Sequence, residues 1–215
     1  MTVRAVVFDV GETLIDETRV WSAWADHLGI SRLTFLAGLG AVIARGLDHT
    51  EVFALFRPDL DVREVLADPA AVELRDTVRA QDFYPDATSC LTALATAGYR
   101  LGVVGNQPST AEAIFREAPV PIELVASSAT WGVAKPDPAF FARIASALDL
   151  SPGEIAYVGD RLDNDVGPAA RAGMLAVFVR RGPWAWIQAG RDRPPDAAVS
   201  IDTLDELPDA LANLR

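Results

Sequence analysis

Carboxylates that directly follow apolar, strand-like runs are the residues of this sequence best suited to chemistry. Asp9 follows the run at residues 4–8, Asp160 follows a second run at 155–158, and Asp165 lies a few residues further on. The carboxyl ends of parallel strands meet at one edge of an open α/β sheet, where ligands bind. Singly, each acid also fits a turn or a solvated loop. Together they would repel one another unless a cation neutralised them, which predicts a Mg²⁺ site with oxygen ligands.

A lysine and an asparagine add candidate groups for binding an anion. Lys135, in the segment 134–138, is the only lysine in a chain that otherwise uses arginine. A fixed ammonium can hold phosphate charge beside an acidic cluster, although a surface lysine before a helix fits the same pattern. Gly105 and Asn106 end another apolar run, at 101–104. Backbone N–H groups at that point could bind a phosphate oxygen.

The composition limits both the class of protein and the kind of site. The chain has 215 residues, half of them apolar, which suits one α/β domain or a domain with an inserted lobe. Its single cysteine, Cys90, excludes an intrachain disulfide and a cysteine-rich zinc site. The net charge of −11 makes nucleic acid and anionic lipid poor partners. Without a signal-like segment or an apolar run of membrane-spanning length, we expect a cytoplasmic protein with no membrane partner.

The elements that position these groups alternate between strand and helix. Strand-like runs are expected at residues 4–8, 101–104, 122–126, 155–158 and 175–179, with an edge strand at 197–201, and helices are expected at 88–97 and 138–148. This alternation predicts a doubly wound parallel sheet, and hence an α/β fold.

Two segments interrupt the alternation of strands and helices. Residues 16–82 contain no convincing strand, but apolar residues recur there at helical spacing in three stretches, which predicts a helical insert. Residues 181–196 are rich in glycine and proline and predict a long loop. The core would therefore consist of residues 1–15 plus 83–215.

Four segments in this order resemble the haloacid dehalogenase (HAD) superfamily across residues 3–180. Phe-Asp-Val-Gly-Glu-Thr-Leu at 8–14 is similar to motif I of the family, and Val-Val-Gly-Asn at 103–106 is similar to motif II. Ala-Lys-Pro-Asp-Pro at 134–138 resembles motif III, and Val-Gly-Asp-Arg-Leu-Asp-Asn-Asp at 158–165 resembles motif IV. The resemblance implies a Rossmann-like core, with the insert at 16–82 in the place of the family's C1-type helical cap.

The resemblance also implies a Mg²⁺-dependent hydrolase acting on a small phosphorylated metabolite. Asp9 would attack phosphorus and form an aspartyl-phosphate. The metal ligands would be Asp9, Asp160 and the backbone carbonyl of Gly11, with Asp165 in or near the outer shell of the ion. Phosphoryl transfer needs mostly positioning and charge neutralisation, which this set of groups would supply.

The remaining candidates would bind the substrate. The resemblance implies that Lys135 bridges the nucleophile and the phosphoryl group. It implies further that Asn106 and the backbone near Gly105 contact the group being transferred. Catalysis would then depend on Asp9, Lys135 and Asn106.

Two positions depart from the pattern of the family's phosphatases. Those enzymes carry a second Asp two residues after the nucleophile as general acid and base, and here the position is Gly11. They also carry Ser or Thr before the motif II asparagine, and here it is Gly105. Glu12, His27 and His49 are candidates to replace the missing acid, although a cap histidine more often packs and Glu12 can point away from the site.

These departures leave two other functions open. The family's 2-haloacid dehalogenases also lack the second acid and need no metal, but Asp160 and Asp165 have no evident use in a metal-free site. A degenerate protein that binds a ligand without turnover is a further alternative. Phosphonate cleavage through a Schiff base needs a cap lysine, and residues 16–82 have none. The sequence does not determine the oligomeric state.

Overall fold

The computed structural model describes residues 2–59, 61, 64, 78–190 and 192–214. The chain forms two compact units, one made of Met1–Asp16 with Arg79–Arg215 and the other of Glu17–Val78. The first unit carries the sheet, and the second is helical in its described part.

The first unit is built on a six-stranded parallel sheet in the order β3-β2-β1-β4-β5-β6. Its strands are β1 (Ala5–Phe8), β2 (Arg100–Gly105), β3 (Leu124–Ser127), β4 (Ile155–Gly159), β5 (Leu175–Val179) and β6 (Val199–Ile201). Every residue of β1 and β4 is buried, as expected for strands covered on both faces. The predicted doubly wound parallel sheet is confirmed, including its edge strand β6.

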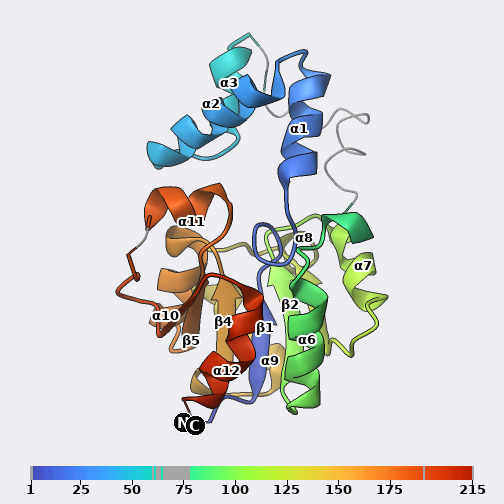
Figure 1. The fold of residues 1–215 in the computed structure, drawn as a ribbon, viewed down its shortest axis with the longest axis vertical. Helices are drawn as coiled ribbons and strands as arrows, with labels where there is room; N and C mark the ends of the chain where they lie inside the picture. Colours follow the sequence, from blue (N-terminus) through green and yellow to red (C-terminus); the bar gives the residue numbers. More distant parts are fainter. Residues whose placement is uncertain (1, 60, 62–63, 65–77, 191, 215) are drawn as a thin grey trace. The chain divides into compact units, whose positions relative to one another are not determined.

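Helices cover both faces of this sheet (Figure 1). The helices of the first unit are α6 (Ala87–Thr96), α7 (Glu112–Arg116), α8 (Ser128–Trp131), α9 (Pro138–Leu148), α10 (Gly167–Arg171), α11 (Gly182–Gln188) and α12 (Leu207–Ala212). On one face, α9 buries Phe140, Phe141 and Ile144 against β4 and β5 in a shared apolar cluster. Fully burying one such side chain contributes about 1.5–3 kcal/mol, so the packing of α9 against the central strands stabilises the core.

The prediction of a long loop at 181–196 is wrong, because α11 occupies part of it. Pro183 lies in the first turn of α11, where a helix tolerates the missing N–H of proline. Gly182, with φ +69°, begins the helix in a conformation that favours glycine. Trp184 is buried and anchors the helix. The glycine and proline that suggested a loop thus mark where the helix begins.

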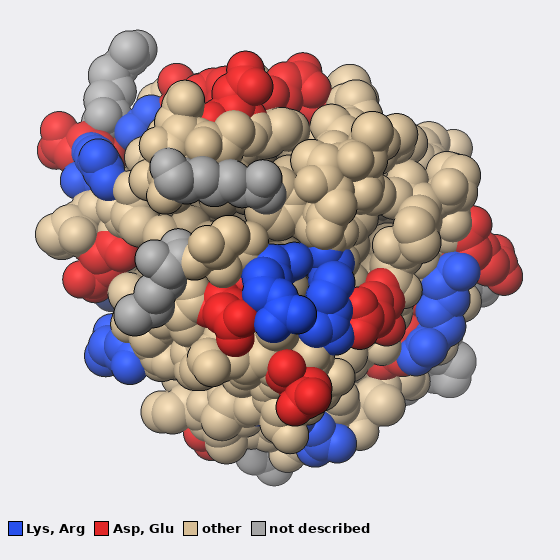
Figure 2. Space-filling view, turned by 90° about the horizontal axis from the view of Figure 1, so that it is seen from below, with Lys and Arg blue, Asp and Glu red and all other residues tan. Residues whose placement is uncertain are grey.

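The edge of the sheet at the strand N-termini carries paired charges. Arg4 lies 3.0 Å from Glu154, and Arg100 lies 2.5 Å from Glu123. In the view from below, the basic side chains at the centre of this face are flanked by acidic ones (Figure 2). The centre of this face is therefore compensated in charge.

The second unit consists, where described, of α1 (Thr18–His27), α2 (Arg32–Ala44) and α3 (Glu51–Phe56). Its interior is aromatic, with Trp24 against Phe53 at 4.8 Å and Phe35 against Phe53 at 6.0 Å between ring centroids. No single described helix is long and apolar enough to cross a membrane. Together, α1 and α2 meet that criterion by length and composition alone, and a bend of 113° separates them.

Candidate active site

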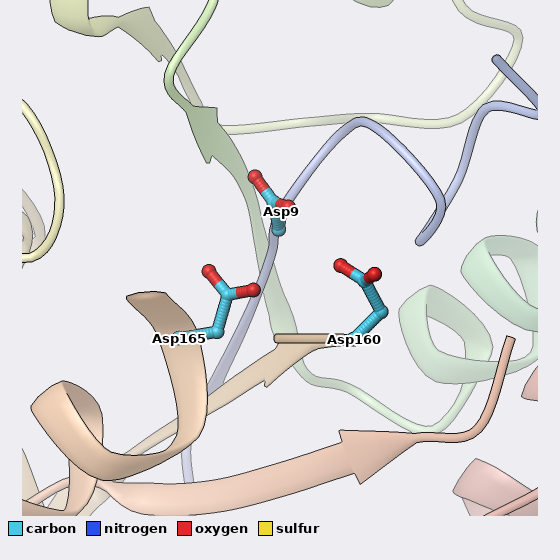
Figure 3. Close-up of side chains that lie close together, drawn as sticks. All are labelled: Asp9, Asp160 and Asp165. Atoms are coloured by element: carbon cyan, nitrogen blue, oxygen red, sulfur yellow. The ribbon is translucent and has the colours of Figure 1, made fainter. Parts of the chain in front are cut away.

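Three buried carboxylates meet at the carboxyl ends of two neighbouring strands. Asp9 directly follows β1 and Asp160 directly follows β4, and the parallel register pairs Phe8 with Val158. Asp165 lies in a π-helical turn (Leu162–Val166) after β4. One oxygen of each acid lies within 4.8 Å of an oxygen of the other two, and Figure 3 shows the carboxylates turned toward a shared space.

Gly159 makes the position of Asp165 possible. A Cβ at residue 159 would meet the Cβ and Cγ of Asp165 at 2.5 Å, so any side chain there would displace the acid. The backbone N–H of Arg161 donates to Asp165 Oδ2 at 3.1 Å. The glycine and this hydrogen bond together seat Asp165 beside Asp9.

Lys135 lies between two of the acids. Its Nζ is 2.6 Å from Asp9 Oδ1 and 2.5 Å from Asp165 Oδ1, and the residue is buried. Burial by itself lowers the pKa of this amine, but the charges of Asp165 and Asp9 outweigh burial and raise the pKa well above its usual value. Lys135 therefore carries its positive charge throughout the ordinary pH range.

One ammonium compensates the charge of the cluster only in part. Burial, together with the charges of Asp165 and Asp9, raises the pKa of Asp160 well above its usual value. Burial also raises the pKa of Asp165 to about 6, with Lys135 opposing the rise. Asp160 Oδ2 is buried and has no hydrogen-bond partner among the described residues. The cluster thus has one ammonium for three carboxylates, and one buried carboxylate oxygen has no hydrogen-bond partner among the described residues. A divalent cation with oxygen ligands would neutralise the excess negative charge.

The Asn106 side chain makes two hydrogen bonds with the backbone of Lys135. Its Nδ2 donates to the Lys135 carbonyl at 2.9 Å, and the Lys135 N–H donates to its Oδ1 at 2.8 Å. Its neighbour Gly105 leaves room for the Asp9 carboxylate, because a Cβ there would meet Asp9 Oδ1 at 2.6 Å. A serine or threonine at 105 would therefore require the Asp9 carboxylate to turn away.

The candidates for the missing acid lie in different places. Glu12 is buried next to Gly11, and its Oε2 accepts a hydrogen bond from Tyr84 at 2.6 Å. Its φ of +52° is uncommon for a residue other than glycine. His27 and His49 belong to the second unit, where His27 packs edge-on against Trp24 and His49 packs edge-on against Trp21.

Tyr84 and Arg181 are residues of this region that sequence reasoning missed. The Arg181 guanidinium lies 4.2 Å from the centre of the Tyr84 ring and donates to the Thr13 carbonyl at 3.1 Å and to Asp86. These contacts tie the turn after β1 to segments far along the chain. No local pattern distinguishes Arg181 from the other arginines, so only the tertiary fold reveals it.

Replacing Gly159 or Gly105 with alanine should lower the free energy of unfolding by different amounts. We expect Gly159→Ala to lower the free energy of unfolding by about 1–3 kcal/mol, because the new methyl group overlaps the Cβ of Asp165. Gly105→Ala should be milder, since its closest contact is the tip of the Asp9 side chain, which can rotate, and the atoms of Val10 lie further away, at 3.2 and 3.4 Å. Urea unfolding of both variants tests this order, and the reverse order would contradict the packing described for Gly159.

Comparisons with known proteins agree with this architecture. A family model for haloacid dehalogenase-like hydrolases matches residues 3–173. A glyceraldehyde 3-phosphate phosphatase from Methanopyrus kandleri is 30% identical over an alignment covering 99% of this chain and 98% of its own. The crystal structure of a HAD phosphatase from Thermococcus onnurineus is 28% identical, with a TM-score of 0.61 and coverage of 97% and 98%. An L-2-haloacid dehalogenase from Xanthobacter autotrophicus, at 21% identity, a TM-score of 0.64 and full coverage of both chains, shares the fold.

Proposed function

This chain belongs to the haloacid dehalogenase-like hydrolase family and is an enzyme, and we propose that it is a Mg²⁺-dependent phosphatase that acts through an aspartyl-phosphate on Asp9. The observation that carries the proposal is the buried cluster of Asp9, Asp160 and Asp165, in which Asp160 Oδ2 lacks a partner among the described residues. A metal-free dehalogenation has no use for that oxygen, whereas a phosphatase needs a cation there. The glyceraldehyde 3-phosphate phosphatase relative supports a small phosphorylated metabolite as substrate.

In the proposed reaction, an oxygen of Asp9 attacks phosphorus while the bond from phosphorus to the ester oxygen breaks. Water then hydrolyses the aspartyl-phosphate, which releases phosphate and restores the Asp9 carboxylate. Asp9, Asp160 and the backbone carbonyl of Gly11 would hold the metal, with Asp165 beside them. When bound, Mg²⁺ would neutralise charge that develops on the phosphoryl oxygens.

Lys135 would both orient the nucleophile and face the transferring group. Its ammonium lies 2.6 Å from one Asp9 oxygen, which leaves the second oxygen for attack. A fixed positive charge in a buried site stabilises a phosphoryl group without reorganisation. We propose further that the insert at residues 16–82 serves as a cap for this core.

The test is a panel of phosphorylated metabolites assayed with Mg²⁺ and with chelator, alongside 2-haloacids in chelator. We expect phosphate release that requires Mg²⁺ and is lost in Asp9→Asn. Dehalogenation that survives chelation would favour the dehalogenase instead. If no compound turns over while Asp9→Asn binds the same ligands as wild type, the chain is a binding protein.

The glycine at position 11 predicts how turnover depends on the leaving group. Gly11→Asp should speed the cleavage of alkyl phosphates by roughly 10²-fold, the lower end of what a general acid contributes. Aryl phosphates should gain less, because an aryl oxide leaves with little need of a proton.

Single-turnover kinetics on a matched aryl and alkyl pair measure this difference. Gly11→Asn is the control, since it has similar size but no proton to donate. If wild type cleaves the alkyl ester as fast as Gly11→Asp, another residue supplies the proton, and Glu12, His27 and His49 should be replaced in turn.

A further inference from the structure

We propose that Asn106 is a positioning residue that fixes the backbone of Lys135, so that the Lys135 ammonium reaches both Asp9 and Asp165. This role differs from the contact with the transferring group that the family resemblance implies for Asn106. It rests on the proposed function only for its kinetic test.

The evidence is a two-point contact between one side chain and one peptide unit. The Asn106 carboxamide accepts from the Lys135 N–H at 2.8 Å and donates to the Lys135 carbonyl at 2.9 Å. A single hydrogen bond would leave Lys135 free to rotate about it, whereas two bonds from a planar amide fix both position and orientation. The reverse placement of the amide would set donor against donor, so the contact also determines which way Asn106 faces.

The backbone around Asn106 is more rigid than the backbone around Lys135. This difference indicates which residue positions the other. Asn106 directly follows β2, a strand hydrogen-bonded on both sides, to β1 and to β3. Lys135 lies between α8 and α9 in a segment without helix or strand. The rigid end of β2 therefore positions the irregular segment, rather than the reverse.

Fixing that backbone matters because the lysine side chain is long and flexible. Its four-carbon stem carries large rotamer entropy, yet its ammonium must lie 2.6 Å from Asp9 and 2.5 Å from Asp165. A displacement of about 1 Å at a reacting group lowers rates by as much as 10²-fold. With its oxygen and one N–H bound to Lys135, the Asn106 amide keeps its orientation, and only its second N–H remains for a substrate.

Because the chain has a single lysine, NMR of labelled lysine can report the environment of Lys135 directly. Lys135 is the only lysine, so protein labelled with [¹³Cε,¹⁵Nζ]-lysine gives one side-chain signal that reports this residue alone. We expect Asn106→Ala to shift and broaden that signal in the absence of any substrate. Asn106→Asp, which can accept from the Lys135 N–H but cannot donate to its carbonyl, should give an intermediate spectrum. Gln107→Ala removes a neighbouring carboxamide outside this contact and should match wild type.

Kinetics of the same variants separate positioning from substrate binding. Asn106→Ala should lower kcat by roughly 10- to 100-fold and leave KM within about threefold of wild type, because the lost interaction acts on the reacting groups. An unchanged lysine signal together with a raised KM would overturn the proposal and restore Asn106 as a substrate contact. If wild type releases no phosphate from any ester, the proposed function fails, and the lysine signal still decides whether Asn106 fixes Lys135.

Discussion

Replacing Asp160 with Asn should abolish the stabilisation of this protein by Mg²⁺ and lower kcat by on the order of 10³-fold, while making the metal-free protein more stable. The first two effects follow because Asp160 would be a metal ligand and the ion supplies several kcal/mol at the transition state. At a Mg²⁺ concentration a hundredfold above Kd, binding stabilises wild type by about 2.7 kcal/mol. For a chain of this size we therefore expect a rise in Tm of roughly 5–10 °C, which the variant should lack.

The gain in metal-free stability follows from the electrostatics of Asp160. Its pKa is raised on folding by burial and by the charges of Asp165 and Asp9. A group whose folded pKa lies above its unfolded value binds more protons when folded, so its ionisation destabilises the folded state increasingly as pH rises from the unfolded pKa toward the folded one. Asparagine has no charge to bury, and at neutral pH it should remove this cost.

A neighbouring acid supplies the matched control. Asp163 lies in the same turn as Asp165, but its carboxylate binds Arg161 and Gln188, and its side chain is 56% exposed. Asp163→Asn should keep the Mg²⁺ response and show no gain in metal-free Tm. Thermal melts with Mg²⁺ and with chelator give the Tm of wild type, Asp160→Asn and Asp163→Asn. A normal Mg²⁺ shift in Asp160→Asn would place the metal site elsewhere.

Lys135→Met should lower both the free energy of unfolding and the activity of the protein. Removing the ammonium leaves Asp9 and Asp165 buried without their counter-ion, and breaking a buried ion pair costs about 3–5 kcal/mol. We expect kcat to fall by at least roughly 10²–10³-fold, the usual effect of removing one fixed group that stabilises transition-state charge.

A second substitution tests whether charge imbalance is the cause. Lys135→Met combined with Asp165→Asn should recover part of the lost stability, because one uncompensated carboxylate is gone, but should not recover turnover. Lys135→Arg is the companion variant. It keeps the charge, so it should be more stable than Lys135→Met, yet its planar guanidinium cannot reproduce a point contact with both acids. The free energy of unfolding in urea measures these effects. If Lys135→Met had the same free energy of unfolding as wild type, a group other than Lys135 would have to neutralise the charges of Asp9 and Asp165.

Much of the fold was predictable because burial leaves a local trace in the sequence. The run Ala5–Phe8 is wholly apolar and forms a wholly buried strand. Strand β4 is likewise buried throughout, and β5 is buried except for its half-buried first residue, Leu175. Once the strands are parallel, their carboxyl ends meet at one edge, so Asp9 and Asp160 were expected at the same edge, and the pairing of β1 with β4 makes them neighbours. Helix α11 escaped prediction because Gly182 and Pro183 suit a loop and a first helical turn equally well.

The sequence by itself thus determined the parallel sheet and the two acids, Asp9 and Asp160, that follow its strands, because side-chain hydrophobicity and strand direction decide both. Only the tertiary structure decided what each polar group touches. Asn106 binds Lys135, and Tyr84 binds Glu12, across separations of 29 and 72 residues. A hydrogen-bonding group can pair with many partners along the chain, and the one it meets depends on the packing of every element between them. The same holds for Gly159, whose missing side chain matters only because Asp165 folds back onto it.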